Sequence, residues 1–246
     1  MPFNFSAVAF DQLLNNAPKL RQLSAGQFKV PIVFRGPNAA AHMLSSTHSQ
    51  AFESFYCGFP GVKVISVATP YDAKGLLKSA IRDDNPVIFF EAEIMYAVKG
   101  EVPDEEYLIP IGEADIKRPG EDVTVITWGQ GVPVALKAAE LAEADGIDCE
   151  VIDLRTLRPL DDEAVLKSVR KTNRAVLVYH GWPYGGVGAE VSDRIQRLAF
   201  DHLDAPVARV CYEDVNMPYA ENLENMVIPS PERALESIRE VRYHEI

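Results

Sequence analysis

Short apolar runs alternate with longer amphipathic segments along most of this chain of 246 residues. A run of four to six apolar residues is typical of a strand whose two faces are both covered, as in a parallel sheet. Strand–helix–strand repetition builds a mainly parallel sheet with helices on both faces. The pattern therefore predicts an α/β protein with mainly parallel sheets.

The first hundred residues contain few predicted strands. Apolar runs predict strands at Val30–Phe34, Val62–Val67 and Val87–Glu91, and a helix at Pro70–Arg82, whose proline suits a first helical turn. The chain opens inside a further predicted helix, Ser6–Asn16, with no strand before it. Because three strands are few for a sheet of this class, we expect a part of this domain to lie upstream of the sequence.

The alternation resumes after Asp122 and continues almost to the end. The expected elements are strand Val123–Thr127, helix Val132–Ala144, strand Cys149–Asp153, helix Asp161–Lys171, strand Ala175–Tyr179, helix Val187–Phe200, strand Val207–Val210 and helix Pro231–Val241. Ser230 is the expected N-cap of the last helix. Between the two regular regions, prolines, glycines and charges predict a linker. We therefore predict domains at residues 1–100 and 123–246, joined by a linker at residues 101–122.

Charge and composition exclude several kinds of partner. Lysine and arginine number 24 against 36 aspartates and glutamates, a net charge of −12. Such a surface repels polyanions, so we expect no nucleic acid and no anionic membrane as partner. No apolar run reaches the roughly 18 residues that a membrane span needs. The three widely spaced cysteines indicate buried thiols of a reducing compartment, and we expect a cytoplasmic protein.

The segment Arg35–Gln50 (RGPNAAAHMLSSTHSQ) is the clearest candidate for chemistry. It follows a predicted strand, at the sheet edge where open α/β folds bind ligands, and it is long for such a loop. Its two histidines, His42 and His48, can act as acids, bases or hydrogen-bond donors to an anionic intermediate. A histidine that only caps the following helix is an equally open reading, and His48 is the stronger catalytic candidate. His180, just past another strand, suits a cleft or a structural role.

Several motifs occur together in a way that is specific to one family. They include FNFS near the start, VPIVFRGPN, HSQAFESFY, DLRTLRPLD, GWPYGGVGAE and DVNMPYA. Over essentially its whole length the chain resembles the pyruvate dehydrogenase E1 β subunits, which are thiamine-diphosphate-dependent 2-oxo acid dehydrogenases. The resemblance implies a transketolase-like pyrimidine-binding domain, incomplete at its N-terminus, followed by a transketolase C-terminal domain.

The resemblance also implies an activity, a cofactor and partners. In the family, two α and two β subunits form a heterotetramer that binds thiamine diphosphate at the α–β interface, with Mg²⁺ on α. Pyruvate is oxidatively decarboxylated, and the acetyl group passes to a lipoyl group of the E2 dihydrolipoyl acetyltransferase. The expected partners are thus an E1 α subunit, a second β subunit and E2.

Site residues carry over by position. His48 matches the histidine that faces the intermediate and assists transfer to the lipoyl group, and Phe5 matches the aromatic residue beside the aminopyrimidine. A structural K⁺ in relatives is bound at the positions of Ile32, Ala80, Ile81, Asp83 and Asn85. By itself the AIRDDN segment at 80–85 is more typical of a plain turn, although a helix end does leave carbonyls free for a cation, and only the resemblance makes the two readings equal.

The chain departs from the family in two respects. The glutamate that activates the aminopyrimidine lies upstream of residue 1, so we expect a truncated chain with little or no activity. The usual PNG is PNA at Asn38–Ala39, and an alanine is strained if residue 39 needs a positive φ. The alternatives are a branched-chain 2-oxo acid or acetoin dehydrogenase β subunit, or a non-catalytic assembly subunit.

Overall fold

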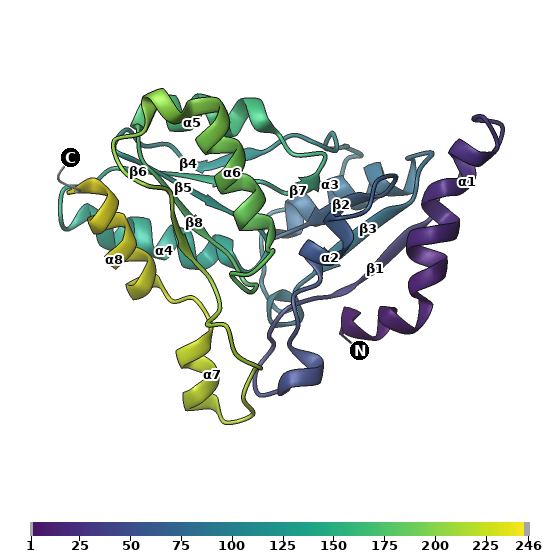
Figure 1. The fold of residues 1–246 in the computed structure, drawn as a ribbon, viewed down its shortest axis with the longest axis horizontal. Coiled ribbons are helices and arrows are strands. Elements are labelled where there is room, and N and C mark those ends of the chain that lie inside the picture. Colours follow the sequence, from purple (N-terminus) through teal and green to yellow (C-terminus); the bar gives the residue numbers. More distant parts are fainter. Residues whose placement is uncertain (1, 244–246) are drawn as a thin grey trace.

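The computed structural model describes residues 2–243. Its strands form two sheets that lie side by side, each flanked by helices (Figure 1). Most neighbouring strands in both sheets are parallel, which confirms the predicted α/β class. Within these residues no helix is long and apolar enough to cross a membrane.

The first sheet has the strand order β1-β3-β2-β7. Its strands are β1 (Val33–Pro37), β2 (Lys63–Ser66), β3 (Val87–Glu91) and β7 (Thr156–Arg158). The first three are the strands that the sequence predicts, with β1 starting three residues late. β7 comes from the second half of the chain and pairs antiparallel with β2, so both halves build this sheet.

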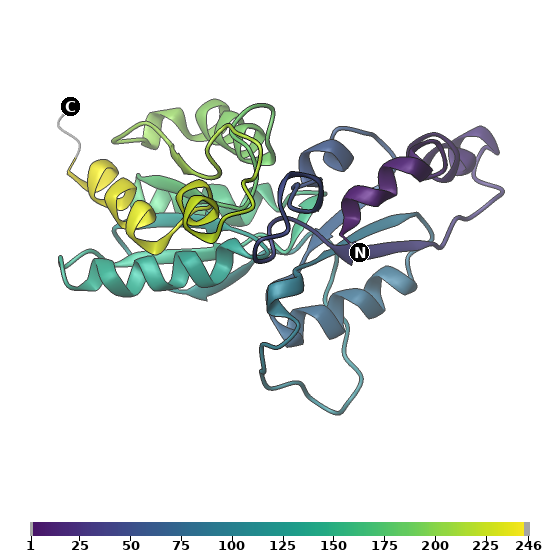
Figure 2. The ribbon, with the colours of Figure 1, turned by 90° about the horizontal axis from the view of Figure 1, so that it is seen from below.

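Helices cover both faces of the first sheet (Figure 2). A helical segment made of η1 (Phe3–Ala9), η2 (Gln12–Asn16) and α1 (Ala17–Leu23) lies on one face with α2 (Glu53–Cys57), and α3 (Pro70–Ile81) covers the other. The predicted opening helix is thus longer than expected. Thr69 caps α3, because its hydroxyl accepts a hydrogen bond from Asp72 N at 3.1 Å.

The second sheet has the order β4-β6-β5-β8-β9. Its strands are β4 (Asp115–Arg118), β5 (Val123–Thr127), β6 (Cys149–Asp153), β8 (Ala175–Val178) and β9 (Ala208–Val210). One face carries α4 (Gly131–Glu143) and α8 (Pro231–Arg242), and the other carries α5 (Asp162–Thr172) and α6 (Val187–Ala199) (Figures 1 and 2). Ser230 caps α8 as predicted, since its hydroxyl accepts from Arg233 N at 3.2 Å.

Three elements escaped the sequence pattern. β4 lies within residues 101–122, where only a linker is predicted, and pairs antiparallel with β6. β7 has three residues, and α7 (Glu221–Val227) has seven. Each is too short to establish a hydrophobic period, so tertiary contacts decide them.

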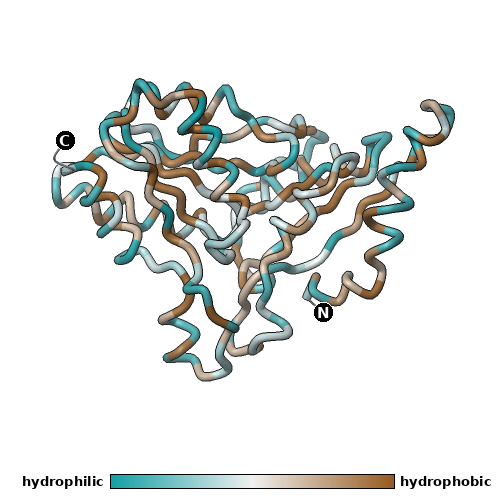
Figure 3. Tube along the Cα trace, viewed as in Figure 1, coloured by the Kyte–Doolittle hydropathy of each residue, from teal (hydrophilic) through white to brown (hydrophobic). Residues whose placement is uncertain are grey.

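One apolar cluster joins the two halves. It contains Tyr56 and Phe90 beside the first sheet, Ile126 and Leu177 of the second sheet, and Val191 of α6. The trace coloured by hydropathy shows the strands of both sheets as apolar segments inside a hydrophilic outer layer (Figure 3). The burial of such a cluster is a main source of folding free energy, so the two halves stabilise one another.

Candidate active site

Phe5 and His48 lie together, as the resemblance implies. Their ring centroids are 5.0 Å apart, although the residues are 43 positions apart in sequence. A hydrogen bond from Asn4 Nδ2 to Thr47 O, at 2.9 Å, joins η1 to η3 (Ser46–His48) next to the two rings. Phe5 therefore lies beside His48 because the N-terminal segment packs against the residues around η3.

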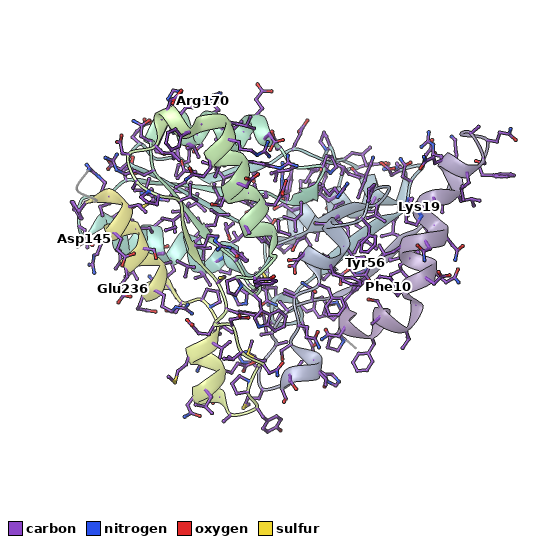
Figure 4. The ribbon with its side chains drawn as sticks, viewed as in Figure 1. Phe10, Lys19, Tyr56, Asp145, Arg170 and Glu236 are labelled. Carbon is purple, nitrogen blue, oxygen red and sulfur yellow. The ribbon has the colours of Figure 1, made fainter. Side chains whose placement is uncertain are left out.

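The N-terminal segment is itself anchored on α2. Ser6 Oγ and Tyr56 Oη lie 2.6 Å apart, and the Phe3 ring contacts the Tyr56 ring edge-on with centroids at 5.4 Å. Phe10 packs against Phe55, and Phe10 and Tyr56 lie close together between the segment and α2 (Figure 4). This aromatic packing fixes the position of Phe5.

Residues 38–52, here called the His48 loop, form a closed loop at the end of β1. Ala39 N donates to Gln50 O at 3.0 Å, and Phe52 N donates to Asn38 Oδ1 at 2.8 Å. The His48 ring uses Nδ1 in a contact with Thr47 Oγ1 at 2.9 Å. Among the described residues no hydrogen bond involves His48 Nε2, so this nitrogen is available to hydrogen-bond a substrate.

The second half of the chain holds the His48 loop in place. Gln130, at the start of α4, donates from Nε2 to the carbonyls of Asn38 and Ala40 at 3.1 and 3.0 Å. Tyr212 Oη accepts from Ala40 N at 2.9 Å, and a carboxylate oxygen of Glu224 in α7 accepts from Met43 N at 2.8 Å. Figure 1 shows α7 beside this loop at the lower edge of the molecule.

His180 is buried and lies outside the His48 loop. It is 7% exposed, and burial lowers its pKa to about 4, so the ring is neutral at pH 7. Its Nδ1 lies 3.4 Å from Tyr212 Oη. Of the two roles that the sequence leaves open for His180, the structure supports the structural one.

Two of the predicted K⁺ residues, Asp83 and Asn85, already contact cationic side chains of the protein. Ile32 O accepts from Val87 N at 2.9 Å and Ala80 O from Asp83 N at 3.3 Å, while Ile81 lies next to Ala80 at the end of α3. The Asp83 carboxylate pairs with the Lys63 ammonium. Asn85 Oδ1 accepts from Arg21 Nη1 at 2.8 Å. In the described part of the chain the side-chain oxygens that a K⁺ would use are therefore occupied.

The described residues form no cluster of the side chains that usually bind zinc or other transition metals. No group of three or more histidines, cysteines, aspartates and glutamates within residues 2–243 could hold a metal ion. The buried Cys149 has a pKa raised to about 12 by burial, so it is a thiol at neutral pH.

Family models match both halves of the chain. The transketolase pyrimidine-binding domain matches residues 1–99, and the transketolase C-terminal domain matches residues 112–234. The pyruvate dehydrogenase E1 component subunit beta of Rickettsia conorii is 47% identical over 246 residues, which is all of this chain and 76% of that protein. The chain belongs to the pyruvate dehydrogenase E1 β-subunit family.

Other members of the E1 β family are equally similar. The subunit of Rhizobium meliloti is 48% identical over 99% of this chain and 53% of its own length. The mitochondrial subunit of Rattus norvegicus is 52% identical over 93% of this chain and 65% of its own. A solved structure described as a split-gene transketolase, an inactive β4 tetramer, matches 98% of this chain and 73% of its own with a TM-score of 0.79. Its identity is 21%, so that likeness shows the fold alone.

The residues of this E1 β chain fit the thiamine diphosphate site that the pyrimidine-binding domain implies. The Phe5 side chain is 42% exposed beside His48, and a flat aromatic ring suits a heteroaromatic ring such as an aminopyrimidine. Ser49 Oγ, one residue after His48, is buried without a hydrogen-bond partner among the described residues. A buried polar atom without a partner is typical of a site that a bound molecule completes.

Sequence reasoning missed the residues that hold the loop. Gln130 is 92 positions from Asn38, and no local pattern reveals such a contact. Glu53, which is 6% exposed, begins α2 five residues after His48, where an acidic residue is ordinary because it suits the helix dipole. Its burial could be learned only from the structure.

Proposed function

We propose that this chain is the β subunit of a pyruvate dehydrogenase E1. In this role it pairs with an α subunit, binds the aminopyrimidine of thiamine diphosphate, and takes part in the oxidative decarboxylation of pyruvate and the reductive acetylation of the lipoyl group of E2. The identity of 47% along the whole chain carries this proposal, because the matched relatives are pyruvate dehydrogenase subunits. The Phe5–His48 pair supports it independently.

Each residue has a specific task in this proposal. Thiamine diphosphate, when bound, supplies the nucleophilic carbon and the electron sink. Phe5 packs against its aminopyrimidine and orients it. His48 directs Nε2 toward the reacting group, where it can act as the acid that assists transfer of the acetyl group to lipoyl. The contacts of Gln130, Tyr212 and Glu224 keep the loop that carries His48 in position.

The test is thiamine-diphosphate-dependent dye reduction with pyruvate by this chain co-purified with its cognate α subunit. A second version carries the N-terminal segment of the Rickettsia conorii subunit. Turnover by either version supports the proposal. Binding to α and E2 without turnover by either version would instead support the non-catalytic assembly subunit. A panel with branched-chain 2-oxo acids and acetoin tests the alternative substrates, and faster turnover of one of these would replace pyruvate.

His48→Gln should separate the two half-reactions. We expect acetyl transfer to lipoyl domains to fall by about 10²- to 10⁴-fold, since a positioned acid or base contributes that much. Decarboxylation measured with an artificial dye should fall far less, because the dye needs no proton from His48. His202→Gln, at an exposed position in η5 (Phe200–His202), is the control and should match the parent protein in both assays.

We also propose the assembly and location that the resemblance implies. Two β and two α subunits would form a heterotetramer that binds E2, with Mg²⁺ held by α, in the cytoplasm. Mass measurement of the co-purified complex tests the α2β2 composition, since any other stoichiometry rejects it. Cell fractionation tests the location, and the proposal fails if the chain is recovered in another compartment.

A K⁺ at Ile32, Ala80, Ile81, Asp83 and Asn85 remains a proposal that rests on the resemblance alone. Because Lys63 and Arg21 already neutralise this cluster, an ion there would have to be held mainly by backbone carbonyls. The measurement is the thermal midpoint in KCl against NaCl at equal ionic strength. A higher midpoint in KCl would establish the site, and equal midpoints would remove it.

A further inference from the structure

Glu53 is a buried carboxyl group directly behind the His48 loop. It is 6% exposed and lines a small cavity together with Asn38, Trp128, Gln130 and His180. Ser66, Val67, Glu91 and Ala92 complete much of the wall. These residues follow the ends of strands of both sheets, so the cavity lies where the two halves meet beside the candidate active site.

No cation neutralises Glu53. Among residues 2–243 no lysine or arginine forms an ion pair with its carboxyl group. The neighbouring Glu91 carboxylate is already held by Arg35 Nε at 2.5 Å and Tyr96 Oη at 2.8 Å. The titratable groups nearest Glu53 are neutral or acidic, namely His180, Cys57, Tyr212 and Glu224. The guanidinium of Arg158 contacts the Cys57 carbonyl at the other end of α2 rather than Glu53. Burial without a cation favours the protonated form of a carboxyl group.

Two unpartnered polar atoms belong to the side chains that line the same cavity. Trp128 Nε1, a donor, and Gln130 Oε1, an acceptor, are buried without hydrogen-bond partners among the described residues. The cavity leaves about 10 Å³ for the centre of a water molecule, which is about the room that one water needs. A single water can accept from Trp128 and donate to Gln130 while bonded to Glu53.

The loop in front of Glu53 contains strained backbone conformations. Four of its non-glycine residues have positive φ, at Ala39, His42, Met43 and Ser45. Such backbone strain lowers the cost of local opening. Asn38 links the strained loop to the Glu53 cavity. Its Oδ1 accepts from Phe52 N at the start of α2, and its backbone carbonyl accepts from Gln130 Nε2.

We propose that Glu53 is a positioning residue whose bound proton is linked to closure of the His48 loop, with one water molecule bridging Glu53, Trp128 and Gln130. The closed loop keeps Glu53 buried and protonated, and the open loop exposes it to solvent and releases the proton. Burial raises the pKa of Glu53 to about 7, opposed by the hydrogen-bonding groups of its own backbone amide and of the Asn38 and Trp128 side chains. The link to catalysis rests on the proposed function, whereas the proton linkage itself does not.

The linkage fixes the sign of the pH effect. Between the ordinary glutamate pKa of about 4.3 and the closed-state value of about 7, the open loop has lost the proton and the closed loop retains it. Opening therefore becomes easier as pH rises through this window, by up to about tenfold per pH unit. Above about pH 7.5 both forms are ionised and the dependence ends.

The experiment is amide hydrogen exchange of residues 39–50 in the purified chain from pH 5.5 to 8.5, with each rate divided by its intrinsic chemical rate. The parent protein should lose protection as pH rises to about 7 and then level off. Glu53→Gln keeps the shape of the side chain but cannot ionise, so its protection should not change with pH. Glu105→Gln, at an exposed position, is the matched control and should follow the parent protein.

A pH-independent parent profile, or a Glu53→Gln profile that keeps the slope, would overturn the proposal. If Glu53→Gln does not fold, infrared spectra of an Asp153→Asn variant decide, because Asp153 also keeps its proton to about pH 7 and would give a band of its own in the parent protein. They should show a protonated carboxyl band that disappears with the same midpoint as the loss of protection, and no such band at pH 6 also overturns it. Neither readout needs turnover, so an inactive complex would reject the proposed function without affecting this result.

Discussion

At the scale of single residues, the His48 loop contains backbone conformations that its amino acids do not favour. Ala39 has φ 66°, which meets the condition under which the sequence analysis expects strain at the PNA motif. Ser45 has φ 63° and ψ −172°, a region that is almost restricted to glycine. The loop keeps these conformations because Gln130, Tyr212 and Glu224 hold it.

Ser45→Gly should stabilise the protein. The substitution removes backbone strain of roughly 1–3 kcal/mol from the folded protein. Glycine also gives the unfolded chain more conformational entropy, which costs about 0.5–1 kcal/mol of stability. We therefore expect the free energy of unfolding to increase by about 1 kcal/mol. Urea unfolding measures this difference. Ser192→Gly in α6 is the control, because its helical backbone gains nothing from glycine, and it should lose about 0.5–1 kcal/mol. A loss at Ser45 like the loss at Ser192 would contradict the strain argument.

At the scale of elements, caps and hydrophobic period explain which predictions hold. The last helix is predicted from Ser230 and Pro231, and α8 begins at Pro231 with the Ser230 cap in place. The charged strand β4 has no apolar alternation (DIKR), and it forms because β6 offers an edge to pair with. Capping residues close in sequence therefore determine where a helix begins, whereas pairing with a neighbouring strand determines whether a short edge strand forms.

Ser230→Ala should destabilise the protein by about 1 kcal/mol, because Arg233 N then loses its hydrogen-bond acceptor. The measurement is the urea midpoint at an unchanged slope. Ser237→Ala inside α8 is the matched control, since alanine is the better helix former there and the stability should stay equal or rise slightly. Equal losses for both variants would show that the cap does not matter.

At the scale of the whole molecule, a buried ionic network joins the two halves. Asp72, at the start of α3, accepts from Lys117 Nζ at 2.6 Å and from Arg155 Nη1 at 3.1 Å. Asp153 is fully buried beside them, 3.8 Å from Lys117 Nζ, and its Oδ2 has no hydrogen-bond partner within the described residues. Burial raises the pKa of Asp153 to about 7, although Lys117 opposes this.

Asp153→Asn should change how stability depends on pH. An unfolded aspartate releases its proton near pH 4, whereas the folded protein keeps the Asp153 proton to about pH 7. The contribution of this group to stability is therefore full below about pH 4 and is lost as pH rises to 7. We expect the stability of Asp153→Asn relative to the parent to rise by roughly 2–4 kcal/mol over this range, measured by urea unfolding. Asp201→Asn, at an exposed position, should show a pH-independent difference, and the same behaviour at Asp153 would refute the argument.

The sequence by itself determined the class of the fold, most strands and helices, the cap of α8 and the candidates Phe5 and His48. These follow from local period, capping chemistry and motifs, which lie within a few residues of one another. The domain boundaries at residues 100 and 123 stay predictions, and β7 crosses between the two parts by pairing with β2.

Only the tertiary structure decided how the site is built. It brought Phe5 to His48, placed Gln130 on the loop carbonyls and buried Glu53 without a cation. It also placed Lys63 and Arg21 on the side chains predicted to bind K⁺. These contacts join residues from 20 to 92 positions apart, and burial and charge pairing depend on the packed chain rather than on any local pattern.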